Sequence, residues 1–184
     1  MRFSRILWLA AAFLLAPFFL SAFSFSCSAT PEEIQVYIDD ITEPGHIGAD
    51  IHNNYVYSGS NTPEYPGHQP PEGVYRLTPE IYYGVNKNLE LGLYSLSSYG
   101  PDDRASYDGE KLRIKYIADH DETMGSFWGA NFEFGWINHR FAEEPWNAEP
   151  KGICGFRKGL WLFAVNPNLD WVFGFDQQPG GIEH

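Results

Sequence analysis

The stretch at residues 76–97 (RLTPEIYYGVNKNLELGLYSLS) constrains the fold more than any other part of this sequence. Apolar and polar side chains alternate along both halves of it, and Asn86, Lys87 and Asn88 separate the halves. Because successive side chains of a β-strand point to opposite faces, this alternation predicts a β-hairpin with a tight turn at 86–88. Its two faces meet unlike surroundings, and the apolar face packs against either a protein core or lipid.

The composition extends this prediction to the whole chain. A length of 184 residues suits one domain, and aromatic content of 17% with 18 Gly and 13 Pro favours strands joined by turns. The net charge of -12 argues against nucleic acid and anionic lipid headgroups as partners. We therefore expect an all-β domain over residues 30–184.

The N-terminus has the features of a secretory signal peptide. Arg2 and Arg5 precede an apolar run at 6–25, and Cys27-Ser28-Ala29 places small residues before a cleavage site at Thr30. We predict a signal peptide at residues 1–29; a retained membrane anchor is the alternative, since the run is long enough to span. After cleavage Cys154 is the remaining cysteine, so no internal disulfide is expected.

Extended segments with turn residues between them fill the rest of the chain. Besides the hairpin, we expect them at 33–41, 46–57, 110–120, 126–140, 153–165 and 169–175. The last two form a second hairpin at 166–168, because VNKNLE at 85–90 and VNPNLD at 165–170 share a V-N-x-N-L-acid pattern. Short connections at 43–45, 86–88, 121–125 and 166–168 then alternate with longer loops.

Strand length, alternation and unequal connections together match an antiparallel up-and-down transmembrane β-barrel with about eight strands visible. The apolar faces are bulky in nearly every strand, and the opposite faces carry charges of both signs, which can pair within a lumen. Aromatic residues near strand ends are candidates for interfacial girdles: Tyr57, Tyr82, Tyr99, Trp128, Trp136, Trp161 and Trp171. The predicted lumen-lining residues are Asp50, His52, Arg76, Glu80, Glu90, Lys111, Arg113, Lys115, Glu133 and Arg157.

Five runs resemble an uncharacterised, porin-like family of Gram-negative outer-membrane β-barrels: VYIDDITEPG (36–45), TPEYPGHQPPE (62–72), RLTPEIYYGV (76–85), NLELGLY (88–94) and WLFAVNPNLDW (161–171). The family is similar in style to barrels associated with meta-pathway phenol degradation, and the resemblance covers roughly 34–175. It implies a barrel in the outer membrane, with lipid and the barrel-assembly machinery as partners, and no catalytic residues. Members of such a family continue through further strands, so we expect this chain to be a truncated member.

The first extended segment conflicts with a simple barrel topology. If the short turns are periplasmic, a spanning strand at 33–41 would leave the mature N-terminus outside the cell. Either this segment lies inside the lumen or against the barrel, or the sidedness is reversed.

The histidines give no metal signature. His46 and His52 share one strand face but stand about 20 Å apart when extended, so they cannot share an ion without help from another strand. No spacing resembles a zinc site, and we expect neither a metal nor a cofactor. Asp50, His52 and Glu80 could face one another in the lumen, but no sequence feature orders them as nucleophile, base and orienter, so we expect no enzyme.

The leading functional hypothesis is therefore a porin-like or structural outer-membrane barrel, with passive diffusion of small solutes along a charged lumen. Two alternatives stay open. One is a soluble periplasmic β-barrel that binds an apolar ligand inside, and the other is a lumenal hydrolase.

Overall fold

The computed structural model describes residues 35–102 and 104–174, so the predicted signal peptide at 1–29 lies outside the described residues. Within these ranges the chain forms strands and no helix. The strands are β1 (Ile47–Tyr55), β2 (Tyr75–Asn86), β3 (Leu89–Tyr99), β4 (Ala105–Ile117), β5 (Met124–Ile137), β6 (Trp146–Lys158), β7 (Trp161–Val165) and β8 (Trp171–Phe173).

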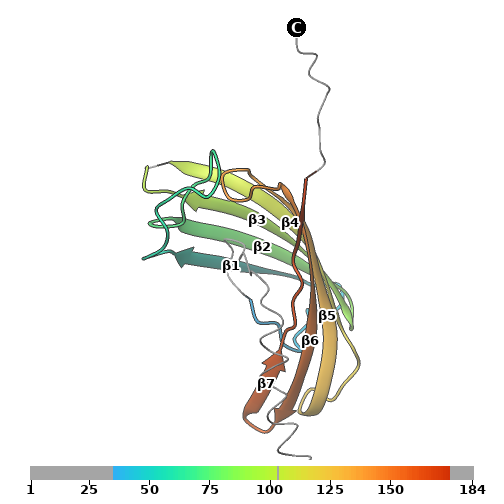
Figure 1. The fold of residues 1–184 in the computed structure, drawn as a ribbon. Helices are drawn as coiled ribbons and strands as arrows, with labels where there is room; N and C mark the ends of the chain where they lie inside the picture. The colour runs from blue at the N-terminus through green and yellow to red at the C-terminus, as the bar shows by residue number, and fades with distance from the viewer. Residues whose placement is uncertain (1–34, 103, 175–184) are drawn as a thin grey trace, which may run out of the picture. The chain divides into compact units, whose positions relative to one another are not determined.

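The strands form one antiparallel sheet in which each strand from β1 to β7 pairs with the next along the chain, and β8 pairs with β6. This confirms the predicted all-β, up-and-down architecture. The sheet curls into a half-barrel with a concave and a convex face (Figure 1). Among the described residues no ladder joins β1 to β7 or β8, so this half-barrel is open.

The hairpin predicted at 86–88 is confirmed. β2 ends at Asn86 and β3 begins at Leu89. The side chain of Asn86 accepts a 2.8 Å hydrogen bond from the backbone N–H of Asn88, and Asn88 Nδ2 donates to the carbonyl of Ile117 at 2.7 Å. Side-chain amides that bond to nearby backbone groups in this way favour turns over continued strand.

The second predicted hairpin is wrong. β6 turns at 159–160, where Gly159 has a φ of +58°, and β7 then runs back along β6. β8 pairs farther along the same edge of β6, and an isolated bridge joins Lys151 to Asn168 between them. Residues 166–168 are thus a break within one interrupted strand, because Pro167 has no N–H to give to a ladder.

Two loops are shorter than predicted. β4 begins at Ala105 and β6 at Trp146, so the connections are 100–104 and 138–145 in place of the expected 99–109 and 141–152. The register of β4 against β3 shifts near Gly109, which a φ of +149° allows. Because of these changes the connections do not alternate strictly between short and long.

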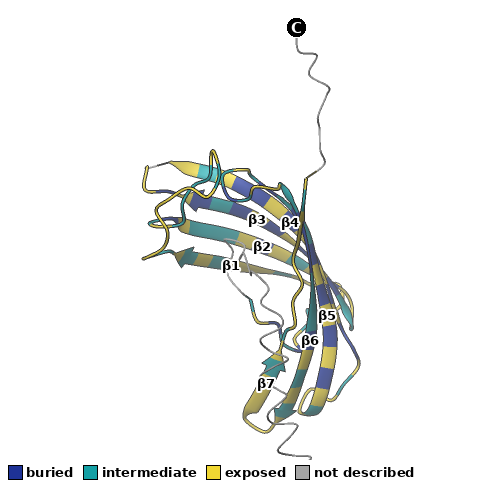
Figure 2. Cartoon of the chain, in the orientation of Figure 1, coloured by how far each residue is buried: buried dark blue, intermediate teal, exposed yellow. Residues whose placement is uncertain are grey.

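Burial alternates along the strands in the reverse of the usual sense (Figure 2). On β4, Lys111, Arg113 and Lys115 are buried, whereas their neighbours Leu112 and Ile114 are exposed. The apolar cluster of buried residues is small and lies on the concave side: Tyr37, Ile117, Phe127 and Ile153. Most of what the sheet buries is therefore polar.

Candidate functional site: a charged concave face

The ten residues predicted to line a lumen all lie on the concave face. Six of them are buried, with at most 5% of each residue exposed: Glu80, Glu90, Lys111, Arg113, Lys115 and Glu133. His52, Arg76 and Arg157 are half-buried, and Asp50 is exposed. The ladders bring them together, since Asp50 stands opposite Glu80, Glu90 opposite Lys115, and Arg113 opposite Glu133.

Arg113 is the centre of the first charged cluster. Its Nη2 lies 2.5 Å from Glu80 Oε1 and 2.8 Å from Glu90 Oε1. A cation buried to this degree needs paired carboxylates, because removal from water without them costs several kcal/mol. Gly92, opposite Arg113, provides the room: a Cβ there would stand 2.8 Å from both Arg113 Nε and Glu80 Oε1.

Aromatic rings surround the same guanidinium. The Arg113 Cζ lies 5.7 Å from the ring centroid of Tyr37, 5.8 Å from that of Tyr82 and 5.9 Å from that of Tyr94. The position of Tyr82 corrects a sequence-based prediction, which placed it in an outer aromatic girdle. Tyr82 shares the face of Glu80 because the two are two residues apart on β2.

A second charged cluster joins β4, β5 and β6. Lys151 Nζ lies 3.2 Å from Glu133 Oε1 and 3.3 Å from Glu149 Oε1. Lys111 Nζ lies 4.0 Å from Glu133 and 3.9 Å from Glu149. Sequence reasoning missed Glu149 and Lys151, because two prolines placed them in a loop. Asn147, Glu149 and Lys151 are polar at every second position, and this alternation indicates a strand with all three side chains on one face.

Residues 35–42, here called the strap, lie across the concave face without forming a strand (Figure 1). Of the two explanations left open for this segment, its placement against the sheet agrees with the first. The Tyr37 backbone N–H donates to Asn166 Oδ1 at 2.8 Å, and Asn166 Nδ2 donates to the Tyr37 carbonyl at 3.1 Å. The Asn166 side chain therefore pairs with the strap much as a neighbouring strand would.

Side chains of the strap enter both charged clusters. Tyr37 donates from its hydroxyl to Glu133 Oε1 at 2.7 Å, and Thr42 donates to Glu90 Oε2 from its backbone N–H at 2.8 Å. Burial, together with the charge of Glu133, raises the pKa of the Tyr37 phenol far above its ordinary value. The phenol therefore stays protonated and remains a donor at any physiological pH.

The two aspartates of the strap bind cations of the sheet. Asp40 Oδ1 lies 2.6 Å from Lys115 Nζ. Asp39 accepts hydrogen bonds from Arg157 at 2.5 and 3.1 Å, and its Oδ2 lies 3.2 Å from His120 Nε2. Burial opposes ionisation of Asp39, but the hydrogen bonds and charge of Arg157 outweigh it and lower the pKa of Asp39 below its ordinary value.

A cavity of about 580 Å³ lies between the strap and strands β1 to β4. Its wall carries Asp50, His52, Glu80, Glu90, Arg113 and Lys115 from the sheet, and the strap contributes Asp40. Its size is in the range of small-molecule sites, but its charged lining is unlike the apolar lining that most such sites have.

Comparisons of the chain with protein-family models, curated proteins and solved structures find no match. In the part of the chain that the structure describes, no helix is long and apolar enough to cross a membrane.

Proposed function

We propose that this chain forms the wall of an outer-membrane β-barrel with a porin-like or structural role, in which small solutes diffuse along the charged concave face. The observation that carries the proposal is the reversed burial of the sheet. Charged side chains are buried on the concave face, while the convex face exposes bulky apolar residues such as Ile51, Leu93 and Phe132. Lipid is the surrounding in which such a convex face is favourable.

The convex aromatic residues support the same proposal. Tyr55, Tyr75 and Tyr99 stand opposite one another in register at one end of β1 to β3. Trp136 pairs with Trp146 at the same end of β5 and β6, and the Trp136 ring lies 6.5 Å from that of Tyr107. A row of amphipathic rings along one edge of a sheet is the pattern of an interfacial girdle.

A second row of rings crosses the opposite end of the sheet. Tyr116 and Trp128 lie there with ring centroids 6.0 Å apart, and Tyr83 lies on the convex face near the same end of β2. On β5, Trp128 lies four residues inside the start and Trp136 lies one residue before the end, and the stretch between them is about 26 Å long at the usual rise of a strand. At the usual strand tilt of about 35–45°, this length covers about 18–21 Å of an apolar band that is about 25 Å tall in outer-membrane barrels.

The polar concave face argues against a soluble barrel that binds an apolar ligand inside. Such a protein needs an apolar interior, whereas here the interior side carries Lys111, Glu133 and Asn147, each buried. In lipid the free edges of β1 and β7 in the described half-barrel need strands to pair with them.

Cell fractionation tests the proposal. The full chain, expressed in a Gram-negative host, is expected in the outer-membrane fraction and to need detergent for extraction. Recovery in the soluble periplasmic fraction without detergent would overturn the membrane role. Conductance across a planar bilayer then separates the two roles: ion-selective steps indicate diffusion, and incorporation without steps indicates a structural wall.

A further inference from the structure

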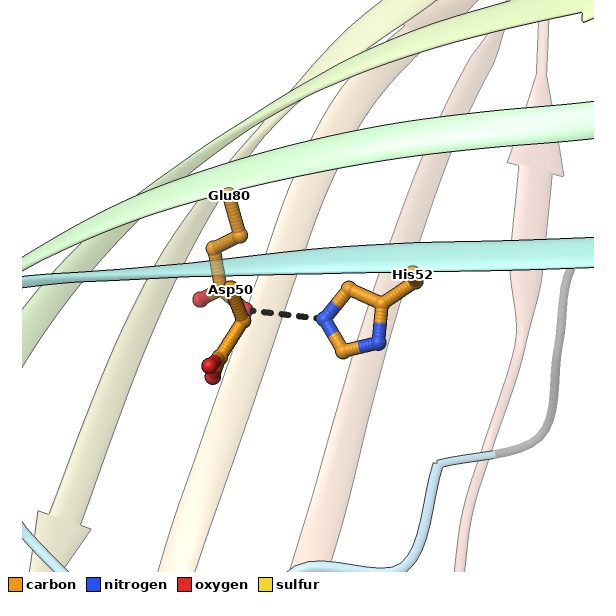
Figure 3. A group of neighbouring side chains, drawn as sticks. All are labelled: Asp50, His52 and Glu80. Carbon is orange, nitrogen blue, oxygen red and sulfur yellow. Dashed lines mark hydrogen bonds and ion pairs between the residues drawn. The ribbon is translucent and has the colours of Figure 1, made fainter.

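One wall of the cavity holds a histidine and two carboxylates from neighbouring strands (Figure 3). Asp50 and His52 share a face of β1 because they are two residues apart, and Glu80 stands opposite Asp50 on β2. One ligand atom from each of the three side chains lies within 4.8 Å of the other two, and His52 Nε2 is 3.4 Å from Glu80 Oε2. His46 and His52 are too far apart along one extended segment to share an ion, but Glu80 of the neighbouring strand β2 lies close enough to His52 to do so.

The three side chains differ in burial in a way that suits a binding site. Glu80 is 4% exposed, His52 is half-buried and Asp50 is exposed at the cavity. Arg113 holds Glu80 through Oε1, which leaves Oε2 directed to His52. The Glu80 carboxylate is therefore held in place, and an ion can reach the three side chains from the cavity.

The charges around the cavity do not balance. Four carboxylates line it, from Asp40, Asp50, Glu80 and Glu90, against the two cations Arg113 and Lys115. Four negative charges less two positive charges leave a surplus of two when His52 is neutral. The buried charges balance, because Glu80 and Glu90 face Arg113 and Lys115, so the surplus lies on the exposed carboxylates of Asp40 and Asp50. A negative surplus lining a cavity attracts a cation, and one bound dication would cancel it.

The ligand atoms, one imidazole nitrogen and two carboxylate oxygens, indicate which class of metal ion fits the site. Calcium and magnesium prefer oxygen ligands alone, whereas imidazole nitrogen together with carboxylate oxygen suits zinc and other first-row transition metals. Ligand atoms around tetrahedral zinc lie about 2.0–2.2 Å from the ion, so any two of them stand roughly 3.3–3.6 Å apart. His52 Nε2 and Glu80 Oε2 are 3.4 Å apart and already have that spacing, and the three ligand atoms all lie within 4.8 Å of one another, so no separation must shorten by more than about 1.5 Å.

We propose that Asp50, His52 and Glu80 bind a divalent transition-metal ion, with its remaining coordination positions open to the cavity. The proposal does not depend on the membrane role, because the site is formed by one face of β1 and β2. The simplest rival is a direct contact between His52 and Glu80 that holds no metal.

Calorimetric titration of the folded full chain with Zn²⁺, in detergent solution, tests the proposal. The natural sequence is expected to bind one equivalent at this site, and His52→Ala and Asp50→Asn are expected to weaken that binding at least about tenfold. His46→Ala is the matched control, since His46 is exposed and lies just before the same strand, and it should leave the affinity unchanged. Zn²⁺ affinity equal in the natural chain and both site variants would overturn the proposal.

Cobalt spectroscopy combined with circular dichroism distinguishes the loss of a metal ligand from the loss of the fold. Co²⁺ bound to the natural chain should give visible absorption bands of a low-coordinate nitrogen–oxygen site, and excess Zn²⁺ should abolish them. His52→Gln, which keeps a polar side chain at this position, should lose the bands while keeping the β-sheet circular dichroism of the natural chain. Bands that persist in His52→Gln would place the metal elsewhere.

Discussion

The two faces of β4 show how differently one strand can be surrounded. Lys111, Arg113 and Lys115 are each at most 5% exposed, whereas Leu112 is 59% and Ile114 47% exposed. In most water-soluble proteins the charged residues are exposed and the apolar ones are buried. The concave face is favourable because its charges pair with one another, and the convex face is favourable only in surroundings that accept apolar side chains.

Substitutions on the two faces therefore destabilise the chain for different reasons, and each face can be tested separately. A change on the concave face breaks pairing inside the protein, and its cost comes from the charges left unpaired there and not from what the convex face contacts. A change on the convex face alters contact with the surroundings, and its cost differs between lipid and water.

The largest effect is expected for Arg113→Met. It leaves Glu80 and Glu90 buried without their shared cation, which should lower the free energy of unfolding by about 3–5 kcal/mol. Urea unfolding in detergent measures it. Adding Glu80→Gln and Glu90→Gln to this variant should restore part of the lost stability.

Arg104→Met is the control, because Arg104 is exposed and its ion pair with Asp102 is 3.8 Å long. Equal losses of stability in the two variants would mean that the burial of Arg113 does not contribute to the effect.

Leu112→Arg examines the convex face at its middle. In a bilayer the arginine should lower the free energy of unfolding by about 2–4 kcal/mol, since it must enter the apolar band. Urea unfolding of chains folded into liposomes measures this. Glu122→Arg, at an exposed position in the 118–123 connection, should change little. A change below about 0.5 kcal/mol at Leu112 is typical of a water-exposed surface and would contradict a lipid-facing role.

Asn166→Ala tests how much the hydrogen bonds between the strap and the edge of the sheet contribute to stability. The change removes the paired hydrogen bonds to the Tyr37 backbone and one to the Gly152 carbonyl, and should cost about 1–2 kcal/mol. Hydrogen exchange at the Tyr37 amide should become faster than in the natural chain. The corresponding change in the other V-N-x-N segment, Asn86→Ala, should leave that amide protected.

Acid should loosen the strap by a smaller amount. Because the pKa of Asp39 is lowered in the folded chain, its pairing with Arg157 stabilises the strap fully above the ordinary Asp value, about 3.9. That stabilisation is lost as the pH falls through the lowered pKa. Tyr37 amide exchange, corrected for its intrinsic pH dependence, should therefore show less protection below about pH 4. Asp39→Asn should remove this step, and a step that persists in the variant would assign it to another carboxyl group.

Alternation predicted the two faces, because the period of a strand depends on local spacing alone. The ten charged positions were placed on one face for the same reason. Glu149 and Lys151 were missed because Pro150 was taken as the sign of a loop, yet Pro150 lies within β6 and accepts a hydrogen bond from Leu169 through its carbonyl. Proline is tolerated here at a strand position whose neighbour is interrupted.

The two V-N-x-N segments show where local pattern stops being informative. At 85–88 the asparagines close a turn, and at 165–168 they break a strand and hold a distant segment. The difference comes from Pro167 and from the presence of the strap, and the second of these lies far away in the sequence. The group formed by Asp50, His52 and Glu80 is likewise a product of register, which no spacing within one strand reveals.

The contact between Tyr37 and Asn166 also sets an order of events. The two residues are separated by 129 positions, and the strap leaves the ribosome first. The contacts of the strap with Glu90 and Lys115 need only β3 and β4, but its contact with Asn166 needs the sheet to be built up to the edge that carries Asn166. Contacts of such long sequence separation form slowly. Until that contact forms, the attachment of the strap over the charged face is incomplete, although its residues precede the whole sheet in the sequence.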